Sequence, residues 1–128
     1  MKRISTMLVM LAGLMPAAAL AQGNVIAQYG AYLGSADHYN SNGAQLSEPW
    51  QVIRQDRANF HKFGIQDQWD EWDGLFANAN NRAKLERLLV NAGFTAAQRR
   101  TIVDNEVFIN VTVFGYGSNI TGVQVDMP

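Results

Sequence analysis

An aspartate interrupts the apolar face of a predicted helix near the middle of the chain. At about 100° per residue, Val52, Ile53, Phe60 and Phe63 form one contiguous apolar face, and Asp56 falls in the middle of it. A bare carboxylate at that position would pay a large desolvation cost. Asp56 is therefore expected to pair with a cation or to accept hydrogen bonds, which makes it the first candidate for chemistry in this sequence.

The candidate partners of Asp56 are Arg57 from the same helix, Arg82, and the backbone N–H groups of the turn at residues 40–43. In a structural interpretation, Asp56 pins a loop or a second helix to the core and the arginines complete the network. In a functional one, Asp56, Arg57 and His61 line a pocket where shifted pKa values serve binding or proton transfer. We prefer the structural interpretation, because Asp56 and His61 lie about 140° apart around the helix and cannot form an acid–base pair on one face.

An acidic and aromatic stretch, DQWDEWDG at residues 67–74, invites a calcium-binding interpretation, because calcium takes several oxygen ligands from a turning backbone. The spacing does not fit an EF-hand: with Gly74 as the loop glycine, Trp69 takes the first ligand position. A helix over Trp69–Ala77 explains the stretch better. Its acidic residues would then lie in the first turn, where the helix dipole favours negative charge, and the tryptophans would face inward.

The two histidines suggest a second possible function, that of a small envelope hydrolase, as the alternative to a binding protein. Such an enzyme would use His38 or His61 with one of the carboxylates Asp37, Asp56 and Asp70, and two of these groups would have to converge in one pocket. The sequence contains neither a nucleophile elbow nor a phosphate-binding loop. Without cysteine, a zinc site on the histidines would need carboxylate ligands. We therefore assign no catalytic residue, no metal and no cofactor.

The block RQDRANFHKFG at residues 54–64 resembles a group of small exported proteins of alphaproteobacteria. The resemblance extends to the segment DHYNSNG at residues 37–43 and to the acidic stretch downstream, so that it covers most of the chain after residue 21. It implies a bacterial, exported protein. It implies no activity and transfers no catalytic residue.

Four helices are predicted from caps and apolar periodicity. Ser47 is expected to cap the first, followed by Pro49 in its opening turn, and Gly64 is placed to end it. Thr95 opens a capping box for the last. The expected ranges are 48–62, 69–77, 80–92 and 96–104.

Near residue 107 the apolar period changes from that of a helix to that of a strand. Residues 107–114 and 120–125 alternate around a glycine-rich turn, which predicts a C-terminal hairpin. A hairpin alone is marginal in water and needs a third strand or a helical layer. Residues 25–33 fit a strand or a helix equally well. The expected fold is α+β, with three or four short helices packed on a C-terminal antiparallel hairpin and an N-terminal third strand as an option.

The N-terminus has the pattern of an export signal. Lys2 and Arg3 precede an apolar stretch at residues 7–20, and Ala19 and Ala21 form a small-x-small cleavage site. The stretch is shorter than the roughly 20 apolar residues of a membrane-spanning helix. We therefore expect residues 1–21 to be removed as a signal peptide and residues 22–128 to form one domain in the periplasm or outside the cell.

The expected mature chain is mildly acidic and free of cysteine. Without residues 1–21 it holds 8 Lys and Arg against 11 Asp and Glu. This balance argues against nucleic acid as the main partner, because phosphate binding needs a basic surface. The lack of cysteine means that packing alone must hold the domain together, without the disulfides common in small exported domains.

Small size, missing catalytic signatures and a good supply of aromatic residues favour a non-enzymatic accessory or binding domain. Its partner would be a protein or a glycan. The open edge of the hairpin offers a second route to partners by strand addition, including self-association. The candidate binding residues are Asp56, Arg57, His61, Trp69 and Trp72.

Overall fold

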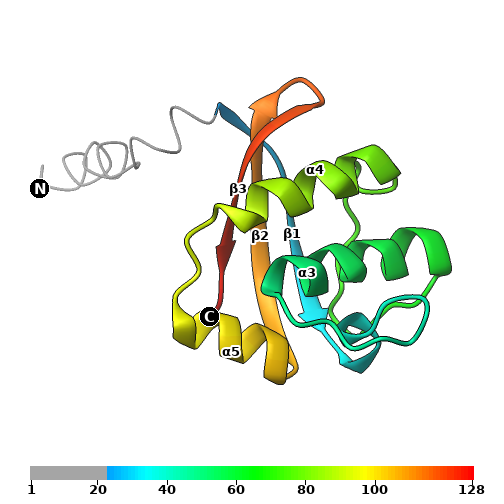
Figure 1. The fold of residues 1–128 in the computed structure, drawn as a ribbon. Coiled ribbons are helices and arrows are strands. Elements are labelled where there is room, and N and C mark those ends of the chain that lie inside the picture. Colours follow the sequence, from blue (N-terminus) through cyan, green and yellow to red (C-terminus); the bar gives the residue numbers. More distant parts are fainter. Residues whose placement is uncertain (1–22) are drawn as a thin grey trace, which may run out of the picture.

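The computed structural model describes residues 23–128, which form an α+β fold with three α-helices and one antiparallel sheet. The helices α3 (Pro49–Ala58), α4 (Ala79–Val90) and α5 (Ala96–Asp104) cover one face of the sheet (Figure 1). The expected signal peptide and its cleavage site lie outside the described residues. Among residues 23–128, no helix is long and apolar enough to cross a membrane.

The sheet has the strand order β1-β2-β3, with bounds β1 (Asn24–Leu33), β2 (Val107–Tyr116) and β3 (Asn119–Asp126). The segment that fitted either a strand or a helix is therefore a strand, and it completes the C-terminal hairpin as a third member. Tyr29 pairs with Val111 and Ala31 with Ile109. Since β2 lies in the middle, the free edge of the hairpin is β3, and strand addition at that edge stays a prediction.

The core lies between the helices and one face of the sheet. Alternate residues of β1 and β2 point into it, as the period of two requires. The buried apolar residues that meet there are Tyr29, Ala31, Leu33, Val52, Ile53, Phe76, Leu85, Leu89, Ile102, Ile109, Val111, Val113, Ile120 and Val123.

The first predicted helix is present but changes type before its end. Glu48, not Ser47, occupies the N-cap position, because Pro49 is already the first helical residue. After Ala58 the chain makes a π-helical turn, η2 (Asn59–Phe63), and ends at Gly64 in the left-handed region with φ 68°. The wider π turn changes the angular position of the residues that follow. Phe63 consequently leaves the apolar face on which it was expected and is 45% exposed.

The second predicted helix, Trp69–Ala77, was wrong. Residues 64–78 form turns and irregular backbone instead. The acidic side chains of this loop accept hydrogen bonds from backbone N–H groups, an alternative that competes with helix formation. The tryptophans do not face inward: Trp69 is 68% exposed and Trp72 is 72% exposed.

The last two helices agree with their sequence signals within two residues. Helix α4 begins after Asn78, whose side chain accepts hydrogen bonds from the N–H groups of Asn80 and Asn81. Helix α5 begins after Thr95, and its capping box with Gln98 is formed. Local capping chemistry therefore sets where both helices begin.

Candidate functional site

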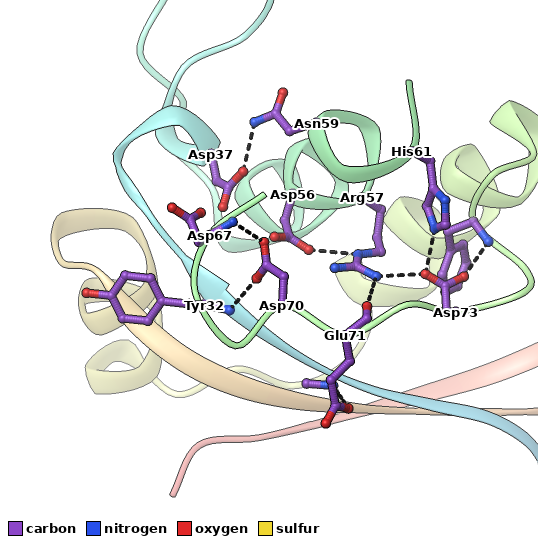
Figure 2. A network of polar contacts seen from close by, with 12 residues as sticks. Tyr32, Asp37, Asp56, Arg57, Asn59, His61, Asp67, Asp70, Glu71 and Asp73 are labelled. Atoms are coloured by element: carbon purple, nitrogen blue, oxygen red, sulfur yellow. Dashed lines mark hydrogen bonds and ion pairs between the residues drawn. The ribbon is translucent and has the colours of Figure 1, made fainter. Parts of the chain in front are cut away.

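A fully buried arginine joins helix α3 to the loop of residues 64–78. The Arg57 side chain is 0% exposed. Its Nε donates to Asp56 Oδ2 at 2.7 Å. Its Nη1 donates to Asp73 Oδ1 at 2.7 Å and to the carbonyl oxygen of Glu71 at 2.9 Å. Figure 2 shows these contacts converging on one guanidinium, so that Arg57 contacts two buried carboxyl groups and holds the loop.

Aromatic rings cover the flat faces of the same guanidinium. The Arg57 Cζ lies 4.0 Å from the centroid of Tyr29 and 4.5 Å from that of Phe60. Burial alone would lower the pKa of Arg57, but the neighbouring Tyr29, Asp56 and Asp73 outweigh it and raise this pKa above its ordinary value. Arg57 is therefore a permanent cation inside the core.

Asp73 connects this cation to His61. Its Oδ1 accepts from Arg57 and also from His61 Nε2 at 2.8 Å. Its Oδ2 accepts from the backbone N–H groups of Leu75 at 2.9 Å and Phe76 at 2.6 Å. Burial tends to raise the pKa of Asp73, but the hydrogen bonds from His61, Phe76 and Arg57 prevail and hold it below its ordinary value. Asp73 is thus an ionised anchor for the loop.

On the other side of Arg57 lie four aspartates, Asp37, Asp56, Asp67 and Asp70 (Figure 2). Each has fewer hydrogen-bond donors around its carboxyl group than Asp73 has. The oxygens of Asp37 accept from the backbone N–H of Gly34 at 3.1 Å and from Asn59 Nδ2 at 2.8 Å. Burial raises the pKa of Asp37 to about 7, with the Asn59 bond opposing the rise and the charge of Asp67 adding to it. Burial likewise raises the pKa values of Asp56 and Asp70. Burial therefore favours the protonated form of Asp37, Asp56 and Asp70 relative to an aspartate in water.

The acidic stretch also occupies the outer edge of β1. Asp70 Oδ1 accepts from the N–H of Tyr32 at 2.8 Å, and Glu71 Oε1 accepts from the N–H of Gly30 at 2.7 Å. The backbone N–H of Glu71 donates to the carbonyl of Gly30 at 2.9 Å. Each contact satisfies a backbone group that an edge strand would otherwise leave unpaired. The loop is consequently fixed both to the sheet and, through Arg57, to the core.

The two exposed tryptophans lie on this fixed loop. Trp69, Asp70, Glu71 and Phe108 line an open depression of about 620 Å³. The ring of Phe108 lies over Gly30, where an added Cβ would come within 2.6 Å of the ring. Because Gly30 has no side chain, the Phe108 ring can lie against its backbone and line the depression together with Trp69.

Asp56, Arg57 and His61 are brought together, but in a buried chain of contacts that runs through Asp73. Asp56 was expected to be paired, and its partner is Arg57. Arg82, another candidate partner, donates instead to the carbonyl oxygens of Phe76 and Ala77. Trp69 and Trp72 lie at the surface of the same loop. A binding role for these residues stays a proposal.

The histidines do not form the pairs that the hydrolase alternative needs. Nδ1 of His38 lies 2.7 Å from the carbonyl oxygen of Gly34, and its Nε2 lies 2.8 Å from that of Ile102 in the last turn of α5. His61 contacts Asp73. Within residues 23–128, neither histidine is hydrogen-bonded to Asp37, Asp56 or Asp70.

Sequence reasoning missed the role of Asp73, which it placed in a helical first turn. The signal was present, since an aspartate before a glycine is typical of a turn in which the side chain accepts from nearby N–H groups. In the part of the chain that the structure describes, no group of three or more His, Asp or Glu residues is arranged to hold a metal ion. Comparisons with family models, curated proteins and solved structures find no match to this chain.

Proposed function

We propose that this protein is an exported, non-enzymatic binding domain that recognises a glycan with the surface around Trp69 and Trp72. One observation carries the proposal: two tryptophans, 68% and 72% exposed, lie on a loop that is fixed to β1 and to the buried Arg57. Large exposed aromatic residues are costly to leave in water and are enriched in binding surfaces. A loop held in advance loses little entropy on binding.

The backbone at Trp69 supports a functional purpose for this loop. Trp69 has φ 70°, and it is the sole non-glycine residue of the described part with a positive φ. It occupies the third position of a turn closed by the N–H of Asp70 donating to the carbonyl of Asp67 at 3.1 Å. Such a conformation costs about 1–3 kcal/mol in a bulky residue and concentrates at functional sites. Glycine would be the residue for this position if folding were the only requirement.

The surroundings of the tryptophans favour a glycan over a protein. A sugar ring offers an apolar face for stacking and hydroxyl groups at its edge, so its site combines aromatic rings with amide and carboxylate groups. Trp69 and Phe108 supply rings, and the exposed Glu71 supplies a carboxylate. The sheet face away from the helices continues this surface with polar side chains, namely Gln28, Asn110, Thr112 and Gln124.

Replacing Trp69 with glycine should separate binding from stability. We expect Trp69→Gly to weaken glycan binding at least about tenfold, because a central aromatic platform is lost. The same change should leave the melting temperature equal or higher, because glycine relieves the positive φ. Tryptophan fluorescence titrated with a panel of oligosaccharides measures the first effect, and thermal unfolding measures the second. The remaining tryptophans, Trp50 and Trp72, report in the variant.

Tyr116→Ala is the matched control, because Tyr116 is 58% exposed on the hairpin and lies outside the depression. It should leave the fluorescence titration unchanged. Equal losses in Trp69→Gly and Tyr116→Ala would contradict the assignment of the surface. Glycan recognition would be refuted if no oligosaccharide gave a response and a protein partner were captured in a way that depends on Trp69. The domain would then be a protein-binding domain.

Export is proposed from the N-terminal residues and has its own test. The chain expressed in a Gram-negative host should appear in the periplasm or the medium with Gln22 as its first residue, as read by mass spectrometry. Ala21→Trp should block processing, because the cleavage site requires a small residue at this position. Processed protein that begins elsewhere, or unprocessed protein confined to the cytoplasm, would contradict the proposal.

A further inference from the structure

A groove between α3 and α4 collects positive charge on a protein that is acidic overall. The groove has a volume of about 380 Å³, and its charged lining residues are Arg54, Lys62, Arg82 and Glu86. Arg54 pairs with Glu86 across the groove. Lys62 and Arg82 form no ion pair with any carboxylate among residues 23–128. The groove therefore carries two cations without an ion-pair partner among the described residues.

Arg82 is the unusual member of this set. It is 6% exposed and lies in the first turn of α4, where the helix dipole disfavours positive charge. Its Nη1 donates to the carbonyl oxygens of Phe76 at 2.7 Å and Ala77 at 3.2 Å. Burial, followed by the charge of Arg54, lowers the pKa of Arg82. A buried cation with no carboxylate in direct contact breaks a local rule of protein stability, and such exceptions concentrate at functional sites.

A purely structural role accounts for only part of this side chain. One nitrogen is enough to hold the carbonyl groups of Phe76 and Ala77, whereas a guanidinium has five N–H donors. Within the described residues, Nε and Nη2 of Arg82 donate to no protein atom, and the side chain lines the groove. Ala79, the first residue of α4, also lines it and adds the positive end of the helix dipole.

We propose that the groove between α3 and α4 binds a small anion with several acceptor oxygens, a phosphate or a carboxylate, held by Arg82 and Lys62. Arg82 provides the fixed part of the site, because its partners lock it in place. Lys62 provides an exposed charge at the rim of the groove, and its ammonium lies 5.2 Å from the centroid of the Phe63 ring. Gln51, Gln55 and Ser41 line the same groove and offer neutral donors for the remaining oxygens.

The test is a titration of the protein beginning at Gln22 with inorganic phosphate and, separately, with citrate at equal ionic strength. Amide chemical shifts in NMR should move saturably for residues around the groove. The ligand with the lower Kd shows whether the groove prefers a phosphate or a carboxylate. Arg82→Gln should weaken binding at least about tenfold, because it removes the charge-assisted donors. Arg87→Gln is the matched control: it removes the same charge from the same helix, but Arg87 is exposed and lies outside the groove.

A second variant keeps the proposal open to refutation if Arg82→Gln fails to fold. Lys62→Glu changes an exposed side chain and should also weaken binding about tenfold, by placing a like charge in the site. The better ligand should raise the melting temperature of the native protein and not that of either groove variant. Shifts that never saturate, or equal losses in the groove variants and in Arg87→Gln, would overturn the site.

Discussion

Replacing Arg57 with methionine should lower the free energy of unfolding by about 3–5 kcal/mol, the largest effect expected of any single substitution in this protein. Methionine preserves much of the side-chain volume and removes the charge. Asp56 and Asp73 would then lose their shared buried cation, and the carbonyl of Glu71 would lose its donor. Uncompensated buried charge is among the costliest defects a substitution can introduce.

Two companion variants show that this cost comes from burial and shared contacts. Arg54→Met removes an arginine from the same helix whose side chain is 41% exposed and paired only with Glu86, so we expect a loss below about 1 kcal/mol. Asp56→Ala should cost about 2–4 kcal/mol, because Arg57 keeps Asp73 and the Glu71 carbonyl. Urea unfolding of the three variants measures their losses in the free energy of unfolding and so gives the order of the three effects. If Arg57→Met costs no more than Arg54→Met, the network does not hold the fold.

The Arg57 network also explains how the proposed binding loop keeps its shape. Residues 64–78 contain no helix or strand, so no regular ladder of backbone hydrogen bonds orders the segment. Arg57 and β1 supply the missing order from outside the loop. Arg57→Met should therefore also weaken binding at Trp69, even under conditions where the variant remains folded. Stability and recognition are linked through one side chain.

The sequence predicted those parts of the fold that depend on neighbours along the chain. Thr95 and Gln98 form their capping box, Gly64 ends its helix, and the period of two marks β2 and β3. The pairing of Asp56 followed from helical spacing and the cost of burying a charge, and Arg57 was among the candidates because it is adjacent. In each case the physical cause acts over a few residues.

The parts that the sequence did not predict depend on contacts between distant segments. Residues 25–33 became a strand because β2, more than 70 residues away, supplies their hydrogen-bond partners. The acidic stretch had the composition of a helical first turn, but the free edge of β1 and the buried Arg57 offered its carboxylates better partners. The π turn that exposes Phe63 left no pattern in the residue types.

The gathered aspartates make the stability of this protein depend on pH in an unusual direction. The pKa of Asp37 rises from an ordinary value near 3.8 to about 7 in the folded protein. Between these two values, the unfolded chain releases a proton that the folded chain retains. Stability therefore falls as pH rises through this window and is fully present only below it, with a total effect on the order of 4 kcal/mol from Asp37 alone.

Asp73 acts in the opposite sense at lower pH. Its pKa is held below the ordinary value, so the stability it contributes is present at neutral pH and is lost when acid protonates it. The two effects together place the expected maximum of stability around the ordinary pKa of an aspartate, between about pH 3 and pH 4. Asp56 and Asp70, whose pKa values are also raised, deepen the loss above that range.

Asp37→Asn should remove much of this pH dependence. An amide cannot ionise, so the free energy of unfolding measured in urea should differ less between pH 5 and pH 8 in the variant than in the native protein. Asp104→Asn is the control, because it makes the same change at an exposed residue and should leave the pH dependence unaltered. A native protein as stable at pH 8 as at pH 5, or equal effects of the two variants, would show that Asp37 is already ionised in the fold. The buried aspartates would then need more compensation than Arg57 and Asn59 provide, because each ionised carboxylate must find its own donors inside the core.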